Sequence, residues 1–169
     1  MLRRLGASED TILVAQSNLA GTYRVLRRHD EALHVKRDVY SGFLKLLGEE
    51  HGDTLRAALN CASAHGDLKR YEEAKALLRK AMPVARRVLG EGHSVTLKMR
   101  WVYARALYEA DGATLDDVHE AVTMLGDTAR IARRVLGGAH PLTTNIEHSL
   151  RKARATLRAR ETPSPPRSA

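Results

Sequence analysis

Hydrophobic residues along this chain recur at helical spacing, in stretches that are separated by glycine. Leu55, Leu59 and Ala62 fall on one face of a helix. The next stretch keeps this spacing at its apolar positions, which are Ala74, Leu77, Leu78, Ala81, Val84 and Val88. The chain lacks runs of alternating β-branched residues, the pattern that is typical of strands. The pattern therefore predicts an all-α protein.

The helical stretches repeat along the chain. Leu-Gly pairs place glycine at positions 6, 48, 90 and 137, which gives spacings of 42, 42 and 47 residues. A period of this size is typical of stacked helical units. We expect the glycines to end helices in the left-handed conformation. A threonine stands six residues after each of the last three glycines, and we expect its hydroxyl to cap the next helix: Thr54, Thr96 and Thr143.

Two features interrupt the repeat. The third copy carries five extra residues within 109–117, which predicts a longer turn between its two helices. Pro83 falls inside the second helix of the second copy. Because proline lacks a backbone N–H, we expect it to kink that helix or to break its bonding locally.

Three motifs share the register of the repeat. Leu-Gly-x-x-His-x-x-Thr-Leu occupies 47–55, Asn-Leu-Ala occupies 18–20, and Arg-Tyr-Glu-Glu-Ala occupies 70–74. Together they resemble the tetratricopeptide repeat (TPR) of kinesin light chains, a repeat type that also occurs in bacterial signalling regulators. The resemblance covers about residues 5–160. It implies a right-handed superhelix of antiparallel helix hairpins that acts as a non-catalytic scaffold for protein–protein interaction.

The resemblance predicts one array over residues 1–160. Its repeats span about 5–46, 47–88 and 89–135, with a half repeat at 136–160, and a Pro- and Ser-rich tail at 161–169 is expected to be disordered. The array starts without a polar capping helix. We therefore expect either a fragment of a longer array or a partner on the outer face of the first hairpin, with self-association as one possibility.

Composition supports a small aliphatic core and argues against several other classes. The chain is 43% hydrophobic but only 4% aromatic. It has no long apolar segment and no signal peptide. The lone Cys61 is predicted to be a buried packing residue in a reducing compartment. The sequence thus predicts a cytoplasmic protein.

Motifs for catalysis are missing from the sequence. It has no phosphate-binding loop, nucleophile elbow, His-Glu-x-x-His or paired cysteines, so we expect neither an enzyme nor a cofactor. His51, His93 and His140 share one repeat position. Equivalent residues of stacked helices lie about 10 Å apart, too far to share one metal ion, so we expect a loop role for them and no metal site.

The resemblance also implies a binding groove. In tetratricopeptide arrays the first helix of each hairpin lines the concave face, where an asparagine bonds the backbone of an extended peptide. By position this role falls on Asn18 and Asn60, whereas the third and fourth copies have Val102 and Ser149. The same face carries cations and aromatic residues. The predicted peptide-binding set is Asn18, Arg24, Arg56, Asn60, Lys98, Trp101, Arg105, Tyr108 and Lys152.

The groove positions carry cations and no acid, which predicts an acidic peptide, with Trp101 and Tyr108 as apolar anchors. The alternative is that Trp101 packs between hairpins and the cations are merely solvated. A detached sensor or scaffold arm of a larger bacterial regulator is a second interpretation.

Net charge opens a third interpretation. The formal charge is +8 and the isoelectric point is near 10.0, which allows nucleic-acid binding. Arg86-Arg87 and Arg133-Arg134 fall in last helical turns, where cations offset the helix dipole. The final helix carries the one dense stripe, formed by Arg151, Lys152, Arg154, Arg158 and Arg160. Without base-reading motifs, nucleic acid is the less favoured partner.

Overall fold

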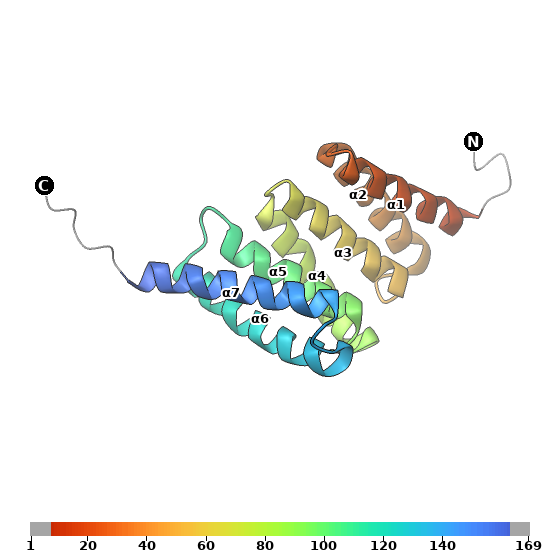
Figure 1. Cartoon of the computed structure of the whole chain (residues 1–169). Helices are drawn as coiled ribbons and strands as arrows, with labels where there is room; N and C mark the ends of the chain where they lie inside the picture. The colour runs from red at the N-terminus through yellow and green to blue at the C-terminus, as the bar shows by residue number, and fades with distance from the viewer. Residues whose placement is uncertain (1–7, 163–169) are drawn as a thin grey trace, which may run out of the picture.

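The computed structural model describes residues 8–162, which form seven α-helices and no strand. The helices are α1 (Glu9–Val25), α2 (His29–Leu47), α3 (Gly52–Asp67), α4 (Tyr71–Leu89), α5 (Ser94–Glu109), α6 (Leu115–Leu136) and α7 (Pro141–Glu161). Figure 1 shows them as a row of helical hairpins, with α1 and α7 at opposite ends. The predicted all-α repeat fold is confirmed. Of the predicted tail, residues 163–169 lie outside the described residues, as does Gly6.

The helices form two layers because each packs on the next along the chain, and odd-numbered helices also pack on each other. α3 contacts α5, and α5 contacts α7, whereas even-numbered helices make no comparable contacts within residues 8–162. Closer approach on one side of a row bends it toward that side. The odd-numbered helices therefore line the inner face.

Alanines allow the helices to pack closely. Ala20, Ala62 and Ala104 occupy one repeat position and are fully buried. Larger side chains fill the space between hairpins, led by Leu55, Leu78, Leu97, Leu107, Leu125 and Ile146. Val88, predicted on the apolar face, is 41% exposed in the last turn of α4. No helix of the described residues is both long and apolar enough to cross a bilayer.

Histidine, not threonine, caps the N-terminus of α3, α5 and α7. Nδ1 of His51, His93 and His140 accepts the backbone N–H two residues later, at 3.2, 3.2 and 3.1 Å. The prediction that Thr54 and its equivalents cap the helices is wrong, because each helix begins before its threonine.

Two of the three threonines instead tie neighbouring helices together, whereas the buried Thr143 hydroxyl has no hydrogen-bond partner within residues 8–162. The Thr54 hydroxyl donates to the Phe43 carbonyl at 3.2 Å, and that of Thr96 donates to the Ala85 carbonyl at 3.4 Å. Both hydroxyls are buried, so each hydrogen bond satisfies a polar group that has left water. Thr54 and Thr96 therefore fix how each hairpin meets the next.

Residues with positive φ follow helices at two kinds of place: at glycines that end the second helix of each hairpin, and in turns within the hairpins. Gly48, Gly90 and Gly137 have φ of 81°, 91° and 89° with ψ of 172°, 162° and 158°. The expected positive φ is confirmed, although the extended ψ is a combination that essentially only glycine adopts. Within the hairpins, Arg27 and Lys69 have φ of 58° and 57° without being glycine.

The third hairpin absorbs its extra residues in two places. Residues 110–114 separate α5 from α6, two residues more than the corresponding turns at 26–28 and 68–70. The remaining three lengthen α6 to 22 residues, against 19 in α4. The predicted longer turn thus accounts for only part of the insertion. Pro83 does not break α4, which runs through it to Leu89.

Candidate functional site

A cavity of about 300 Å³ opens on the inner face of the array. Side chains of α1, α3 and α5 line it together with residues of α2 and α4. Four members of the predicted set reach it, which are Arg24, Asn60, Trp101 and Arg105. The repeat positions thus bring part of the predicted set to one place.

Arg105 is neutralised within its own helix. Its Nε donates to Glu109 Oε1 at 3.2 Å and its Nη2 to Oε2 at 2.9 Å. This two-pronged bond is the main reason that the pKa of Arg105 is raised. Glu109 and Asp67 both line the cavity, so acids stand beside the predicted groove positions, which themselves carry none.

Trp101 both lines the cavity and packs between helices. Its indole Nε1 donates to Ser149 Oγ on α7 at 2.8 Å, and the Arg105 guanidinium lies 5.9 Å from the ring centroid. The hydrogen bond fixes the ring orientation, and the side chain remains half-buried. Packing between hairpins is therefore correct for part of the ring, while the rest faces the cavity.

Tyr108 lies in the core and does not serve as a groove anchor. It is only 7% exposed, and burial raises the pKa of its phenol to about 12. Tyr108 falls on the same side of α5 as Trp101, but α7 packs over this part of the helix. The sequence prediction for Tyr108 is corrected by this packing.

The other predicted positions lie outside the cavity lining. Asn18, Lys98 and Lys152 are exposed on α1, α5 and α7. Arg56 is also exposed, and its Nη1 bonds Asp53 Oδ1 at 2.9 Å. The structure therefore does not gather these four residues around the cavity.

Sequence reasoning missed Lys36, which lines the cavity from α2. Lys36 is 8% exposed, and burial is the main reason that its pKa is lowered, with Asp67 acting in the opposite direction. A signal was present, because Lys36 shares a helix face with the buried Leu33 and Val39. A lysine at a core position of an amphipathic helix indicates a special environment.

Tyr71 was also missed, and it lines the cavity at the start of α4. Burial, followed by the nearby Glu109 carboxylate, raises the pKa of Tyr71. Within residues 8–162 no three His, Cys, Asp or Glu side chains group closely enough to hold a metal ion. The cavity is thus lined by a mixture of polar, charged and aromatic side chains.

Family models for the tetratricopeptide repeat match residues 11–85 and 113–142. The chain belongs to the tetratricopeptide-repeat family. Its repeats are of the kinesin light chain-like type, as its structural neighbours show. Repeats of this family generally mediate protein–protein interaction.

A solved structure from Podosopora anserina, assigned as a kinesin light chain with nearly identical TPR-like repeats, is 27% identical with a TM-score of 0.76. The match covers 87% of this chain and 67% of that one. A variant of the same protein gives 27% identity and a TM-score of 0.77, covering 89% and 68% of the two chains.

BtubC (BKLC) from P. vanneervenii shares the fold, at 17% identity and a TM-score of 0.59, covering 96% of this TPR chain and 70% of its own. No curated protein matches the chain.

Proposed function

We propose that this TPR chain is a non-catalytic interaction module that binds a peptide segment of a partner protein at the inner-face cavity. The observation that carries the proposal is the convergence of Asn60, Trp101 and Lys36 from three different helices on one cavity. A polar amide, an aromatic ring and a buried cation together offer contacts for backbone, apolar side chain and acid.

Asn60 supplies the contact to the peptide backbone. Its half-buried side chain forms no hydrogen bond with other described residues and lines the cavity. An amide group can donate and accept at once, as the peptide backbone does. Asn60 therefore suits an extended segment, whereas the equivalent Asn18 lies away from the cavity.

Lys36 and Arg24 supply the contact to an acidic side chain. Arg105 is already held by Glu109, while Lys36 forms no ion pair within residues 8–162. A buried ammonium gains from an opposite charge that replaces its lost water. A ligand carboxylate at Lys36 would provide this charge, so the acidic end of the peptide lies toward α1 and α2.

The experiment selects binders from a random peptide library and measures their affinity for matched variants. We expect Asn60→Ala to weaken binding about tenfold, as the loss of a buried hydrogen bond does. Lys36→Met removes the charge at similar volume and should weaken acidic peptides selectively. Asn18→Ala is the control, because it removes the equivalent asparagine outside the cavity.

Equal affinities for the wild type, Asn60→Ala and Lys36→Met would overturn the proposal. The same titrations with a single-stranded oligonucleotide test the nucleic-acid alternative. Arg151, Lys152, Arg154 and Arg158 are exposed and form no ion pair within the described part of the chain. Binding of the oligonucleotide that is lost in Arg154→Glu would favour α7 as the binding surface. The cytoplasmic location and the bacterial-regulator interpretation remain predictions.

A further inference from the structure

A second, basic cavity opens on the side of α5 opposite the inner-face cavity. This basic hollow measures about 640 Å³ and is lined by Arg86, Glu91, Arg100, Asp127, Arg130, Ile131 and Arg134. It lies where hairpin α3–α4 meets hairpin α5–α6, which is the second joint of the array. None of its lining residues lines the inner-face cavity.

The first joint, between hairpins α1–α2 and α3–α4, provides an internal comparison. The repeat register sets Glu49, Ala58, Ala81 and Val84 in the places of Glu91, Arg100, Thr128 and Ile131. The cavity at those first-joint positions measures only about 40 Å³. A separate cavity of about 560 Å³ lies toward His65 and does not include Ala58. The second joint thus has the larger cavity, and it lies where Arg100 takes the place of Ala58.

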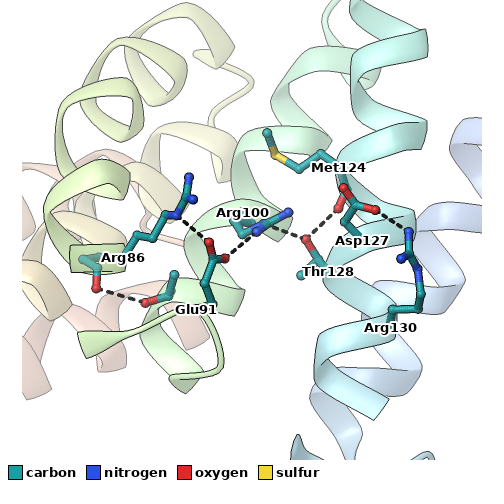
Figure 2. Close-up of polar contacts among 9 residues, drawn as sticks. Arg86, Glu91, Arg100, Met124, Asp127, Thr128 and Arg130 are labelled. Atoms are coloured by element: carbon teal, nitrogen blue, oxygen red, sulfur yellow. Dashed lines mark hydrogen bonds and ion pairs between the residues drawn. The ribbon is translucent and has the colours of Figure 1, made fainter. Parts of the chain in front are cut away.

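Arg100 is held firmly in this hollow. Its Nε donates to Thr128 Oγ1 at 3.0 Å, and the same hydroxyl donates to the Met124 carbonyl at 2.6 Å. Its Nη1 donates to Glu91 Oε2 at 2.9 Å, and its side chain is 19% exposed. Figure 2 shows Arg100 between Glu91 on one side and Thr128 of α6 on the other. The guanidinium is therefore oriented before any ligand arrives, with further N–H donors to offer.

Positive charge exceeds negative charge around the hollow. Glu91 is shared between Arg86 and Arg100, and Asp127 pairs with Arg130 at 2.6 Å. Arg134 forms no ion pair within residues 8–162. Four guanidinium groups thus face two carboxylates. Glu91 shows how a carboxylate is held here by two arginines, and the excess charge suits a second anionic group.

An apolar surface adjoins the basic hollow. A neighbouring cavity of about 820 Å³ shares Arg86, Glu91 and Arg100 with it and adds Met82, Pro83 and Met124. Methionine side chains adapt readily to different apolar groups. Charge and apolar surface therefore lie side by side.

We propose that the basic hollow at the second joint is a peptide-binding site separate from the inner-face cavity. It takes a segment that carries a carboxylate or phosphate beside an apolar residue. The anionic group binds among Arg86, Arg100 and Arg134, and the apolar residue packs on Met82 and Met124.

The test measures fluorescence anisotropy with three labelled peptides. One has a central leucine flanked by glutamates, one replaces the glutamates with phosphoserines, and one replaces them with glutamines. We expect a charged peptide to bind at least about tenfold more tightly than the glutamine peptide, as charge-assisted hydrogen bonds require. The first two arms tell carboxylate from phosphate.

The decisive variant is Arg100→Ala/Thr128→Ala, which gives the second joint the two alanines of the first. We expect it to remain helical and to lose the preference for charged peptides, whereas Asn60→Ala keeps it. Arg134→Glu leaves the Arg100 contacts intact and should also weaken the charged peptides, so it decides the question if the double variant fails to fold.

Three results would overturn the proposal: no binding of either charged peptide, equal binding of the glutamine peptide, or binding that only Asn60→Ala removes. Because Asn60 and Arg100 serve different cavities, failure here is distinguishable from failure of the groove. Binding of a single-stranded oligonucleotide in place of the peptides would also contradict a peptide site.

Discussion

His65 is a half-buried histidine whose Nδ1 atom has no hydrogen-bond partner within residues 8–162. Burial is the main cause that lowers the pKa of His65 below 6.5, opposed by Glu73 and aided by Arg37 and Arg70. As the pH falls, the His65 imidazole is therefore protonated in the unfolded chain before it is protonated in the folded one. We expect the free energy of unfolding to decrease as the pH falls from 6.5 toward the lowered pKa.

Urea unfolding of the wild type and of His65→Gln, at pH values above and below 6.5, measures this effect. The variant should lose less stability on acidification than the wild type does. His148→Gln is the control, because His148 is exposed on α7. Identical losses in the wild type and His65→Gln would show that His65 does not contribute.

The position of a residue in the repeat predicted some residues of the candidate site correctly but not others. Asn60 and Trp101 were found because equivalent positions of stacked helices face the same side. Lys36 was missed because its position among apolar residues predicts burial but does not tell which cavity it reaches, which depends on how α2 packs against α3. Glu109 was overlooked although helical spacing places it one turn after Arg105 on α5. Tyr108 was misplaced because a single-sequence pattern does not reveal that α7 covers it.

At the scale of helices, the histidine cap carries a measurable share of stability. His93 Nδ1 accepts the Val95 N–H at 3.2 Å at the start of α5. We expect His93→Ala to lower the free energy of unfolding by about 1 kcal/mol, while His93→Asn retains most of it. Chemical denaturation measures both, with His148→Ala as the exposed control. Equal stability of His93→Ala and wild type would refute the cap.

In the turn inside the second hairpin we expect a substitution to raise the free energy of unfolding. Lys69 has φ of 57°, and the Arg70 N–H bonds the His65 carbonyl at 2.9 Å, as in a glycine-type helix end. Since a side chain in this conformation is strained, we expect Lys69→Gly to stabilise the chain by up to about 1 kcal/mol.

Lys80→Gly is the matched control for that turn. Lys80 is exposed within α4, where glycine should cost about 1 kcal/mol. Thermal denaturation of both variants gives the comparison. Loss of stability in Lys69→Gly would mean that the backbone at residue 69 is not strained.

The helices themselves were predictable because apolar spacing and glycine both repeat. The glycines at 48, 90 and 137 carry positive φ as expected. Lys69 gave no such signal, because nothing in a lysine indicates a left-handed backbone. Likewise, the extra residues of the third copy could extend a turn or a helix, and the sequence pattern does not decide how they divide.

At the scale of the molecule, the first hairpin differs from the rest by its exposed apolar residues. In α1 only Ala20 is buried, while Val14 and Leu19 are 50% and 46% exposed, and Leu26, just after the helix, is 60% exposed. Self-association through this surface stays a prediction. We expect the mass in solution to rise with concentration, and Leu19→Lys/Leu26→Lys to suppress the rise.

Sedimentation equilibrium measures that mass, with Val135→Lys as the control for an exposed valine on α6, which is 52% exposed. A single monomer mass at every concentration would contradict self-association through α1.

The array as a whole offers two faces, an inner cavity at Asn60 and Trp101 and a basic hollow at Arg100. We propose that a partner peptide binds the inner cavity. Trp101 is the one tryptophan of the chain and lines this cavity, so its fluorescence reports on the site directly.

The most direct measurement is acrylamide quenching of Trp101 fluorescence during titration with a peptide selected from the library. We expect quenching to fall as the peptide saturates, with the same Kd as a fluorescence-anisotropy titration of that peptide gives, and Asn60→Ala to shift both curves alike. Saturable binding that leaves both the quenching of Trp101 and the affinity of Asn60→Ala unchanged would contradict this proposal.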